Sequence, residues 1–197
     1  MAEADLDRLD DFMRLAIKLK GIDRTGWVIS EVSNPEHVGD HSFSTALISF
    51  LLARRTGLDA NKCMLMALIH DLNEVFTGDI ATRFNESDQV IDNKSKRKLG
   101  EESTAKIFAY LPKEESSYLL EIAKEYLLGE SPESKLVHQA DTLDSILLLR
   151  EYSARMKPGM KEEFMLTAGK KIDTKEFRYL YEKVCEEVNA KDERQVK

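Results

Sequence analysis

Hydrophobic residues recur at three- and four-residue steps along nearly the whole chain, which is the period of an amphipathic helix. The first such stripe predicts a helix over about residues 5–20 and consists of Leu6, Leu9, Phe12, Met13, Ala16 and Leu19. No long run alternates strictly between apolar and polar residues, so the pattern predicts no β-strand. The expected fold class is therefore all-α.

Caps and breakers divide the pattern into six to eight predicted helices. Gly57 ends the second helix, and Ser131 followed by Pro132 marks the start of a later one. After the first helix, we expect helices at about 41–55, 59–75, 93–110, 113–127, 132–156, 160–168 and 173–190. The segment CMLMALIH (63–70) is apolar on all sides, which predicts a buried central helix. Residues 22–40 and 77–92 are expected to be irregular.

Length and charge narrow the class of protein. A chain of 197 residues without a linker predicts one domain over 1–197, with helices at 160–190 packing on the rest. The 36 acidic residues exceed the 29 basic ones, and the net charge of -7 argues against broad nucleic-acid binding. This charge is compatible with a small phosphorylated ligand held through a cation.

Several sequence features favour a cytoplasmic location. No apolar run reaches the roughly 20 residues that a membrane helix needs, so no membrane association is expected. The acidic start MAEADLDRLDDF lacks the features of a signal peptide. Cys63 and Cys185 lie far apart and form no CxxC motif, as expected for a reducing compartment.

Potential metal ligands lie in three of the predicted apolar helices. His70 and Asp71 adjoin one another in the most apolar helix, His41 opens another, and Asp141 lies within LVHQADTLDSILLL. Burying such groups is costly unless they are paired or bind a metal. Each could instead be a separate core histidine or ion-pair partner. One cluster that binds a divalent cation accounts for all of them together.

The arrangement H41…H70-D71…D141 resembles the HD-domain superfamily of metal-dependent phosphohydrolases. The local sequences RTGWVISEVSNPEHVGDH (24–41), ALIHDLNEVFTGDI (67–80) and VHQADTL (137–143) are similar to the branch of YfbR-like 5'-deoxynucleotidases. The resemblance covers about residues 8–155, which is the motif-bearing core of the chain.

This resemblance implies a metal centre and a reaction. His41, His70, Asp71 and Asp141 would be the ligands of one divalent transition metal: Mn, Co, Ni, Zn or Fe. The implied activity is hydrolysis of deoxyribonucleoside 5'-monophosphates by a metal-activated water. The family commonly forms homodimers, which implies the same here.

Two acidic residues near the HD pair are candidate catalytic residues. Glu74 is four residues after His70, which predicts that both side chains share one face of a helix. By resemblance Glu74 is the acid/base residue, although it could be a surface residue with an ordinary helical contact. By resemblance Asp79 contacts the sugar of the substrate, and a turn aspartate is the alternative.

Arg24 and Trp27 are the remaining candidate substrate contacts. The bacterial branch has an arginine directly before the tryptophan, whereas this chain reads RTGW and is more similar to eukaryotic and archaeal relatives. Arg83 is therefore an alternative phosphate-binding cation. Trp27 could instead fill a space in the core.

The other histidines and the basic run have simpler interpretations. We expect His37 to be a capping or solvated residue and His138 to support the site or the fold. The run KSKRK (94–98) is expected to be a solvated helix face.

Alternative functions and interfaces stay open from the sequence. The substrate could be another nucleotide: a dNTP, a cyclic nucleotide or a ppGpp-like ligand. The chain could also be a non-enzymatic all-α interaction module. Residues 143–149 and the C-terminal helix (Phe177, Leu180, Tyr181, Val184) could form a dimer interface or belong to the core.

Overall fold

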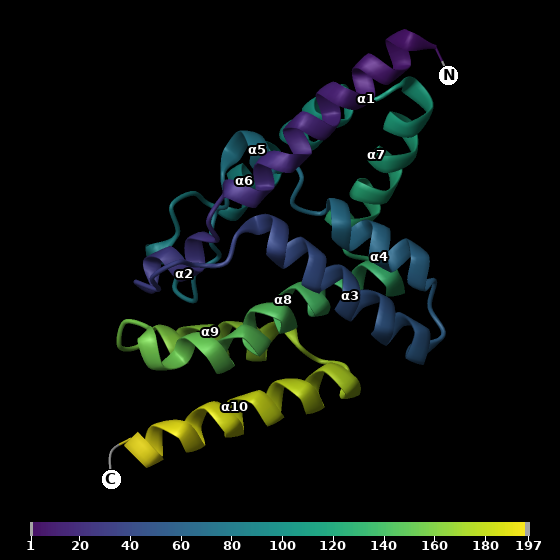
Figure 1. The fold of residues 1–197 in the computed structure, drawn as a ribbon. Coiled ribbons are helices and arrows are strands. Elements are labelled where there is room, and N and C mark those ends of the chain that lie inside the picture. The colour runs from purple at the N-terminus through teal and green to yellow at the C-terminus, as the bar shows by residue number, and fades with distance from the viewer. Residues whose placement is uncertain (1, 196–197) are drawn as a thin grey trace.

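The computed structural model describes residues 2–195, and these form an all-α fold with no strand (Figure 1). Eight of the ten α-helical segments have ten residues or more, so the prediction of an all-α fold with six to eight helices is confirmed. The segments are α1 (Glu3–Ala16), α2 (Thr25–Ile29), α3 (Val38–Thr56), α4 (Ala60–Ile69), α5 (Glu74–Thr77), α6 (Asn93–Phe108), α7 (Lys113–Leu128), α8 (Pro132–Tyr152), α9 (Met160–Lys171) and α10 (Lys175–Gln195).

Local capping explains why most predicted boundaries agree with the structure. The Asp59 carboxylate accepts a hydrogen bond from the backbone N–H of Lys62 at the start of α4. Ser131 accepts one from the N–H of Ser134 at the start of α8. Gly57 ends α3 with a φ of 76°, a left-handed conformation that glycine adopts without steric cost.

Two predicted boundaries were wrong. The segment 22–40, expected to be irregular, contains α2, and α3 begins at Val38 because His37 and Asp40 form its N-terminal cap. The predicted helix 59–75 is interrupted: α4 ends at Ile69, residues 70–73 form turns, and α5 starts at Glu74. This second difference shapes the site described below.

Helix α8 lies at the centre of the core. It contacts α3 and α4, and it also contacts the last two helices, α9 and α10, which lie in the lower part of Figure 1. Leu143, Ile146 and Leu149 of α8 are buried, as are Phe177 and Val184 of α10. These two stretches therefore pack as core rather than as a free interface.

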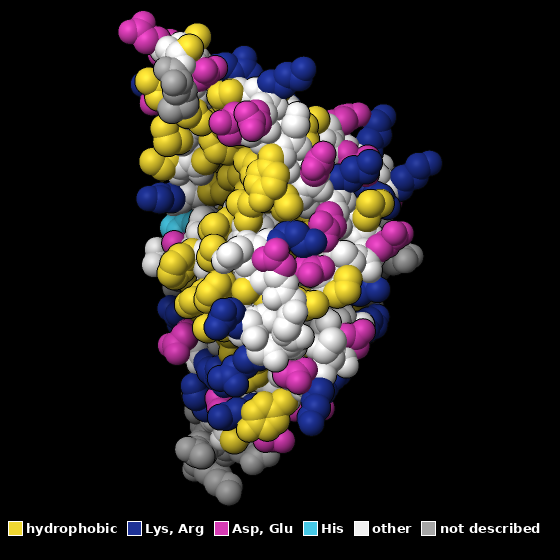
Figure 2. Space-filling view, turned by 90° about the vertical axis from the view of Figure 1, so that its right-hand side faces the viewer, with side chains coloured by type: hydrophobic (Ala, Val, Ile, Leu, Met, Phe, Trp, Pro, Cys, Tyr) yellow, Lys and Arg dark blue, Asp and Glu magenta, His cyan; other side chains and the backbone are white. Residues whose placement is uncertain are grey.

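One apolar surface lies on the outer side of the α3–α4 pair. Phe43, Leu47 and Leu51 recur at four-residue steps along α3 and are exposed, while α4 exposes Met64 (36%) and Leu68 (42%). The prediction that α4 is buried on all sides was therefore wrong. Figure 2 shows hydrophobic side chains gathered over the upper and middle parts of the side of the molecule on which α3, α4 and α7 lie. Within residues 2–195, no helix is long and apolar enough to span a membrane.

Candidate metal centre and pocket

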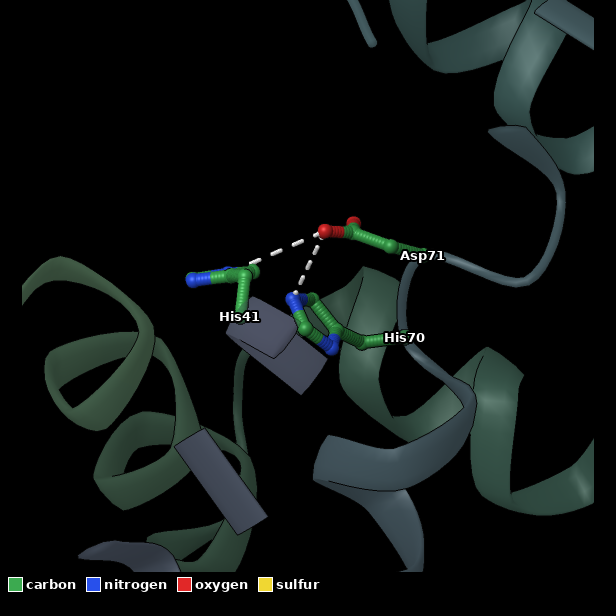
Figure 3. A group of neighbouring side chains, drawn as sticks. All are labelled: His41, His70 and Asp71. Atoms are coloured by element: carbon green, nitrogen blue, oxygen red, sulfur yellow. Dashed lines mark ion pairs between the residues drawn. The ribbon is translucent and has the colours of Figure 1, made fainter. Parts of the chain in front are cut away.

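Three separate segments bring the four predicted ligands together. His41 lies in the first turn of α3, His70 and Asp71 lie in the turn after α4, and Asp141 lies in the middle of α8. His41 Nε2 is 3.1 Å from Asp141 Oδ1 and 3.8 Å from Asp71 Oδ2. His70 Nε2 is 3.0 Å from the same Asp71 oxygen (Figure 3). The nearby ligand atoms of His41, His70 and Asp71 form a group that could hold a metal ion.

The break after α4 explains how adjacent residues both reach the cluster. Neighbouring side chains on a regular helix point about 100° apart and do not face one another. Here the backbone N–H of Leu72 donates a hydrogen bond to the carbonyl oxygen of Ile69, and the N–H of Glu74 donates one to the carbonyl oxygen of Asp71. These are tighter turns than those of an α-helix. Figure 3 shows His70 and Asp71 directed towards the same point as His41.

The hydrogen bonds on the far side of each imidazole define its tautomer. His70 Nδ1 is 2.6 Å from the carbonyl oxygen of Ala67, which can only accept, so Nδ1 carries the hydrogen. His41 Nδ1 is 2.7 Å from the carboxylate of Asp144, with the same consequence. Such outer hydrogen bonds are typical of metal-binding histidines.

The inner nitrogens then face carboxylates without a donor between them. In a neutral ring, the Nε2 atoms of His41 and His70 each carry a lone pair and no hydrogen. Both atoms are buried without a hydrogen-bond partner among the described residues. A lone pair about 3 Å from a carboxylate oxygen is repulsive unless a cation lies between them. Two imidazole nitrogens and two carboxylates form a donor set suited to a divalent transition metal. The residues therefore fit the metal that the sequence predicts.

Without a metal, protons on the imidazole nitrogens occupy the space between the histidines and the carboxylates. Burial alone would lower the pKa of His41, but the carboxylates of Asp141 and Asp144, at 3.1 Å and 2.7 Å from its two ring nitrogens, raise it to about 10. Burial opposes ionisation of Asp71 as well, yet His70, His41 and Arg24 lower its pKa to about 2. The cluster therefore favours positive charge at its centre.

Glu74 lies beside the cluster in an environment that disfavours its charged form. Its Oε2 atom is buried and has no hydrogen-bond partner among the described residues. Burial, followed by the nearby carboxylates of Asp71 and Asp79, raises the pKa of Glu74 well above its ordinary value. The expected single helix through His70 and Glu74 was wrong, because the chain turns between them. The N–H of Glu74 bonds to the carbonyl of Asp71, so Glu74 still follows the metal ligands closely.

Arg24 and Asp79 also lie at this site. The guanidinium of Arg24 is 3.5 Å from Asp71 and donates to the hydroxyl of Ser145. Burial opposes its charge, but Asp79, Asp141 and Asp71 raise the pKa of Arg24, so it stays cationic. Asp79 accepts a hydrogen bond of 2.6 Å from the backbone N–H of Thr25 at the start of α2.

Trp27 forms part of the pocket wall from a buried position. It is only 1% exposed, its indole N–H donates to Glu36, and its ring stacks on Phe164 at 4.4 Å between centroids. Any effect of Trp27 on a ligand would therefore act mainly through the shape of the wall. Arg83, the alternative cation, forms an ion pair with Glu163 instead of standing free.

The two other histidines lie outside the cluster. His37 is the cap of α3 and lies near Asp23 and Asp40, as its capping interpretation predicted. His138 is 2.9 Å from the carbonyl oxygen of Tyr126 and stacks on its ring, and that ring contacts His70 edge-on. His138 therefore supports the site through Tyr126.

The cluster opens into a pocket of about 410 Å³, a size typical of small-molecule sites. Sequence reasoning predicted a helix at 160–168 but missed that one face of α9 lines this pocket, and it missed Asp144 as a partner of His41. Asp144 had a signal, because it is three residues after Asp141 on the same helix. Helix α9 carried no motif, and only its packing brings it to the pocket.

An all-α domain that brings two histidines and two aspartates from three segments together beside a pocket defines the HD class of metal-binding proteins. The chain belongs to the family described as "HD domain", which matches residues 16–181. This confirms the family resemblance noted in the sequence.

Individual relatives agree with this assignment. The chain is 37% identical over 161 residues to 5'-deoxynucleotidase HDDC2 of Mus musculus, covering 81% of this chain and 78% of the mouse protein. It is 36% identical to the Homo sapiens protein of the same name, covering 81% and 76%. A solved structure of a conserved hypothetical protein from Pyrococcus furiosus has a TM-score of 0.69 at 30% identity, covering 89% of this chain and 98% of that one.

Proposed function

We propose that this protein is a metal-dependent 5'-deoxynucleotidase that hydrolyses deoxyribonucleoside 5'-monophosphates to deoxynucleoside and phosphate. The observation that carries the proposal is the pair of buried imidazole Nε2 atoms that face two carboxylates, with the buried carboxyl group of Glu74 beside them. The identity to 5'-deoxynucleotidases from mouse and human supports the substrate class.

The chemistry assigns a role to each group of residues. A divalent metal, when bound, supplies a Lewis acid that activates water and offsets the charge on the phosphate. His41, His70, Asp71 and Asp141 would hold it; the sequence leaves the choice among Mn, Co, Ni, Zn and Fe open. Glu74 holds its proton at a carboxyl group next to the site and gives it to the leaving 5'-oxygen of the nucleoside.

The substrate contacts follow from the positions of the remaining groups. Arg24 is a buried cation between Asp71 and Ser145, which suits contact with a phosphate oxygen. Asp79 has one carboxylate oxygen bonded to Thr25 and lines the pocket, so its other oxygen can accept a hydrogen bond from the 3'-hydroxyl. Trp27 shapes the wall beside them.

Phosphate release from a substrate panel tests this function. We expect the purified protein with Mn²⁺ or Co²⁺ to release phosphate from dAMP, dGMP or dTMP, and to prefer them to the corresponding ribonucleotides. Chelation of the metal should abolish the release. Hydrolysis only of a dNTP, a cyclic nucleotide or a ppGpp-like compound would move the function to another nucleotide. No release under any metal, with no bound metal by elemental analysis, would favour the interaction module.

We also propose that the whole chain acts as one HD domain in a homodimer formed through the α3–α4 surface. Two copies of this apolar surface can pack on each other around a two-fold axis. Burying the exposed part of these side chains between two copies is favourable, because it removes apolar surface from water. The free thiols of Cys63 and Cys185 support a reducing, cytoplasmic location.

Light scattering tests the dimer. We expect a mass twice the chain mass of 22.5 kDa, and a monomer after the double change Leu47→Glu and Leu51→Glu. Tyr179→Glu, at an exposed position on α10, is the matched control and should leave the dimer intact. A monomeric parent protein at all concentrations would refute this interface.

A further inference from the structure

Helix α9 builds a wall of the pocket although it contributes no metal ligand. Its residues on this wall are Met160, Glu163, Phe164, Thr167, Ala168 and Lys171. The segment 80–83, which directly follows Asp79, lines the same pocket. The function proposed above leaves both segments without a role.

One carboxylate joins these two parts of the wall. Glu163 accepts hydrogen bonds from Arg83 Nε at 2.7 Å and from the second guanidinium nitrogen at 2.8 Å. It also accepts a hydrogen bond of 3.1 Å from the backbone N–H of Phe84. Each side chain of the pair is only 18% exposed, and the hydrogen bond from Arg83 lowers the pKa of Glu163, so the pair stays charged.

Contacts on both sides hold this arrangement in place. Phe164, next to Glu163, stacks on Trp27 and approaches Gly26 so closely that a Cβ there would lie 3.1 Å from its ring. Lys96 of α6 donates to the carbonyl of Ile80 at 2.5 Å and to the hydroxyl of Thr82 at 3.2 Å. The segment 80–84 is thus held by α6 on one side and by α9 on the other.

The chemistry of a 5'-mononucleotide indicates what this wall meets. The phosphate and the base are attached at opposite ends of the sugar, so a phosphate at the metal directs the base away from it. Asp79 is the proposed sugar contact, and residues 80–83 continue from it along the pocket. Apolar side chains such as Ile80 and Met160 provide a surface on which a flat base can lie.

We propose that Glu163 and Arg83 are positioning residues that hold segment 80–84 as the nucleobase side of the pocket. This proposal rests on the nucleotide function proposed above. It predicts that breaking the pair weakens binding of a nucleotide and leaves binding of its sugar phosphate unchanged.

Calorimetry of two ligands tests this proposal. The ligands are dAMP and 2-deoxyribose 5-phosphate, which has the sugar and the phosphate but no base. Each is added with Mn²⁺ to protein carrying Glu74→Gln, which slows hydrolysis during the titration. We expect Glu163→Ala to raise the Kd of dAMP about tenfold, because a displaced segment 80–84 no longer contacts the base. The Kd of 2-deoxyribose 5-phosphate should stay within about twofold. Arg83→Ala should have the same effect, and the double variant no more than either single one.

Glu187→Ala is the matched control, because Glu187 pairs with Arg150 Nε at 2.7 Å between α10 and α8, away from the pocket lining. It should change neither Kd. Equal weakening of both ligands, an unchanged Kd for dAMP, or no binding of dAMP by the parent would overturn the proposal. Phosphate release from dAMP by the protein with Glu74 intact is measured separately, so a failure of the nucleobase wall is distinguishable from a failure of the nucleotidase function.

Discussion

Changing Glu74 to glutamine is expected to lower kcat for dAMP by about 10²–10⁴-fold, the range typical of a lost general acid or base. Glutamine keeps the shape and the hydrogen-bonding length of the side chain but cannot supply a proton to the leaving oxygen. Glu74 is not among the predicted ligands, so the metal content should be unchanged. Steady-state kinetics and elemental analysis of the same preparation check both parts.

The pH profile adds a second measurement for Glu74. Its pKa is raised by burial and by the neighbouring carboxylates of Asp71 and Asp79. The carboxyl group therefore keeps its proton to a higher pH than an ordinary glutamate does, and its acid function is lost as the pH rises through the raised pKa. We expect kcat to fall on the alkaline side in the parent protein, and this limb to be absent in Glu74→Gln. Glu121→Gln, on the exposed surface of α7, is the control that should keep the parent profile. Full activity in Glu74→Gln would assign the proton to another group.

Weakened metal binding is the expected result of two aspartate changes on α8. Asp144→Asn removes the charge behind His41 Nδ1 and should weaken Mn²⁺ binding about 10–100-fold, as for other groups that orient a metal-binding histidine. Asp141→Asn removes a predicted ligand and should weaken binding more than Asp144→Asn does. Asp7→Asn, on the exposed part of α1, should bind as the parent does. Calorimetry with Mn²⁺ measures all of these without relying on activity.

The same titrations should depend on pH in a defined direction. Asp141 and Asp144 raise the pKa of His41 to about 10 against the effect of burial, so the metal-free protein carries a proton there at neutral pH. Metal binding must displace this proton. Affinity for Mn²⁺ should therefore fall as the pH is lowered, by about tenfold per pH unit for each proton displaced.

The Asp141 variant also provides the test of the ligand set. Equal Mn²⁺ affinity in the parent and Asp141→Asn would refute the predicted ligand set.

Much of the fold followed from local signals. Helix boundaries at Asp59, Gly57 and Ser131 were predicted correctly because a cap acts on backbone groups within a few residues. The break after Ile69 was missed, since His70 and Asp71 continue an apolar run and contain no helix breaker. The helix breaks there because the adjacent side chains of His70 and Asp71 must both point into the cluster. This requirement arises only when His41 and Asp141 are brought to the same place by the fold.

The sequence by itself determined the helical class and the four candidate ligands, because periodicity and costly polar residues in apolar helices are visible locally. It also indicated the family through the segments around Arg24, His70 and Asp141. Only the tertiary structure decided that Asp144 orients His41, that Glu163 of α9 joins Arg83, and that α3 and α4 share an exposed apolar surface. The physical reason is distance along the chain: His41 and Asp144 are 103 residues apart, and Arg83 and Glu163 are 80 apart. No local pattern encodes such contacts; the packing of α8 against α3 and of α9 against segment 80–84 brings them together.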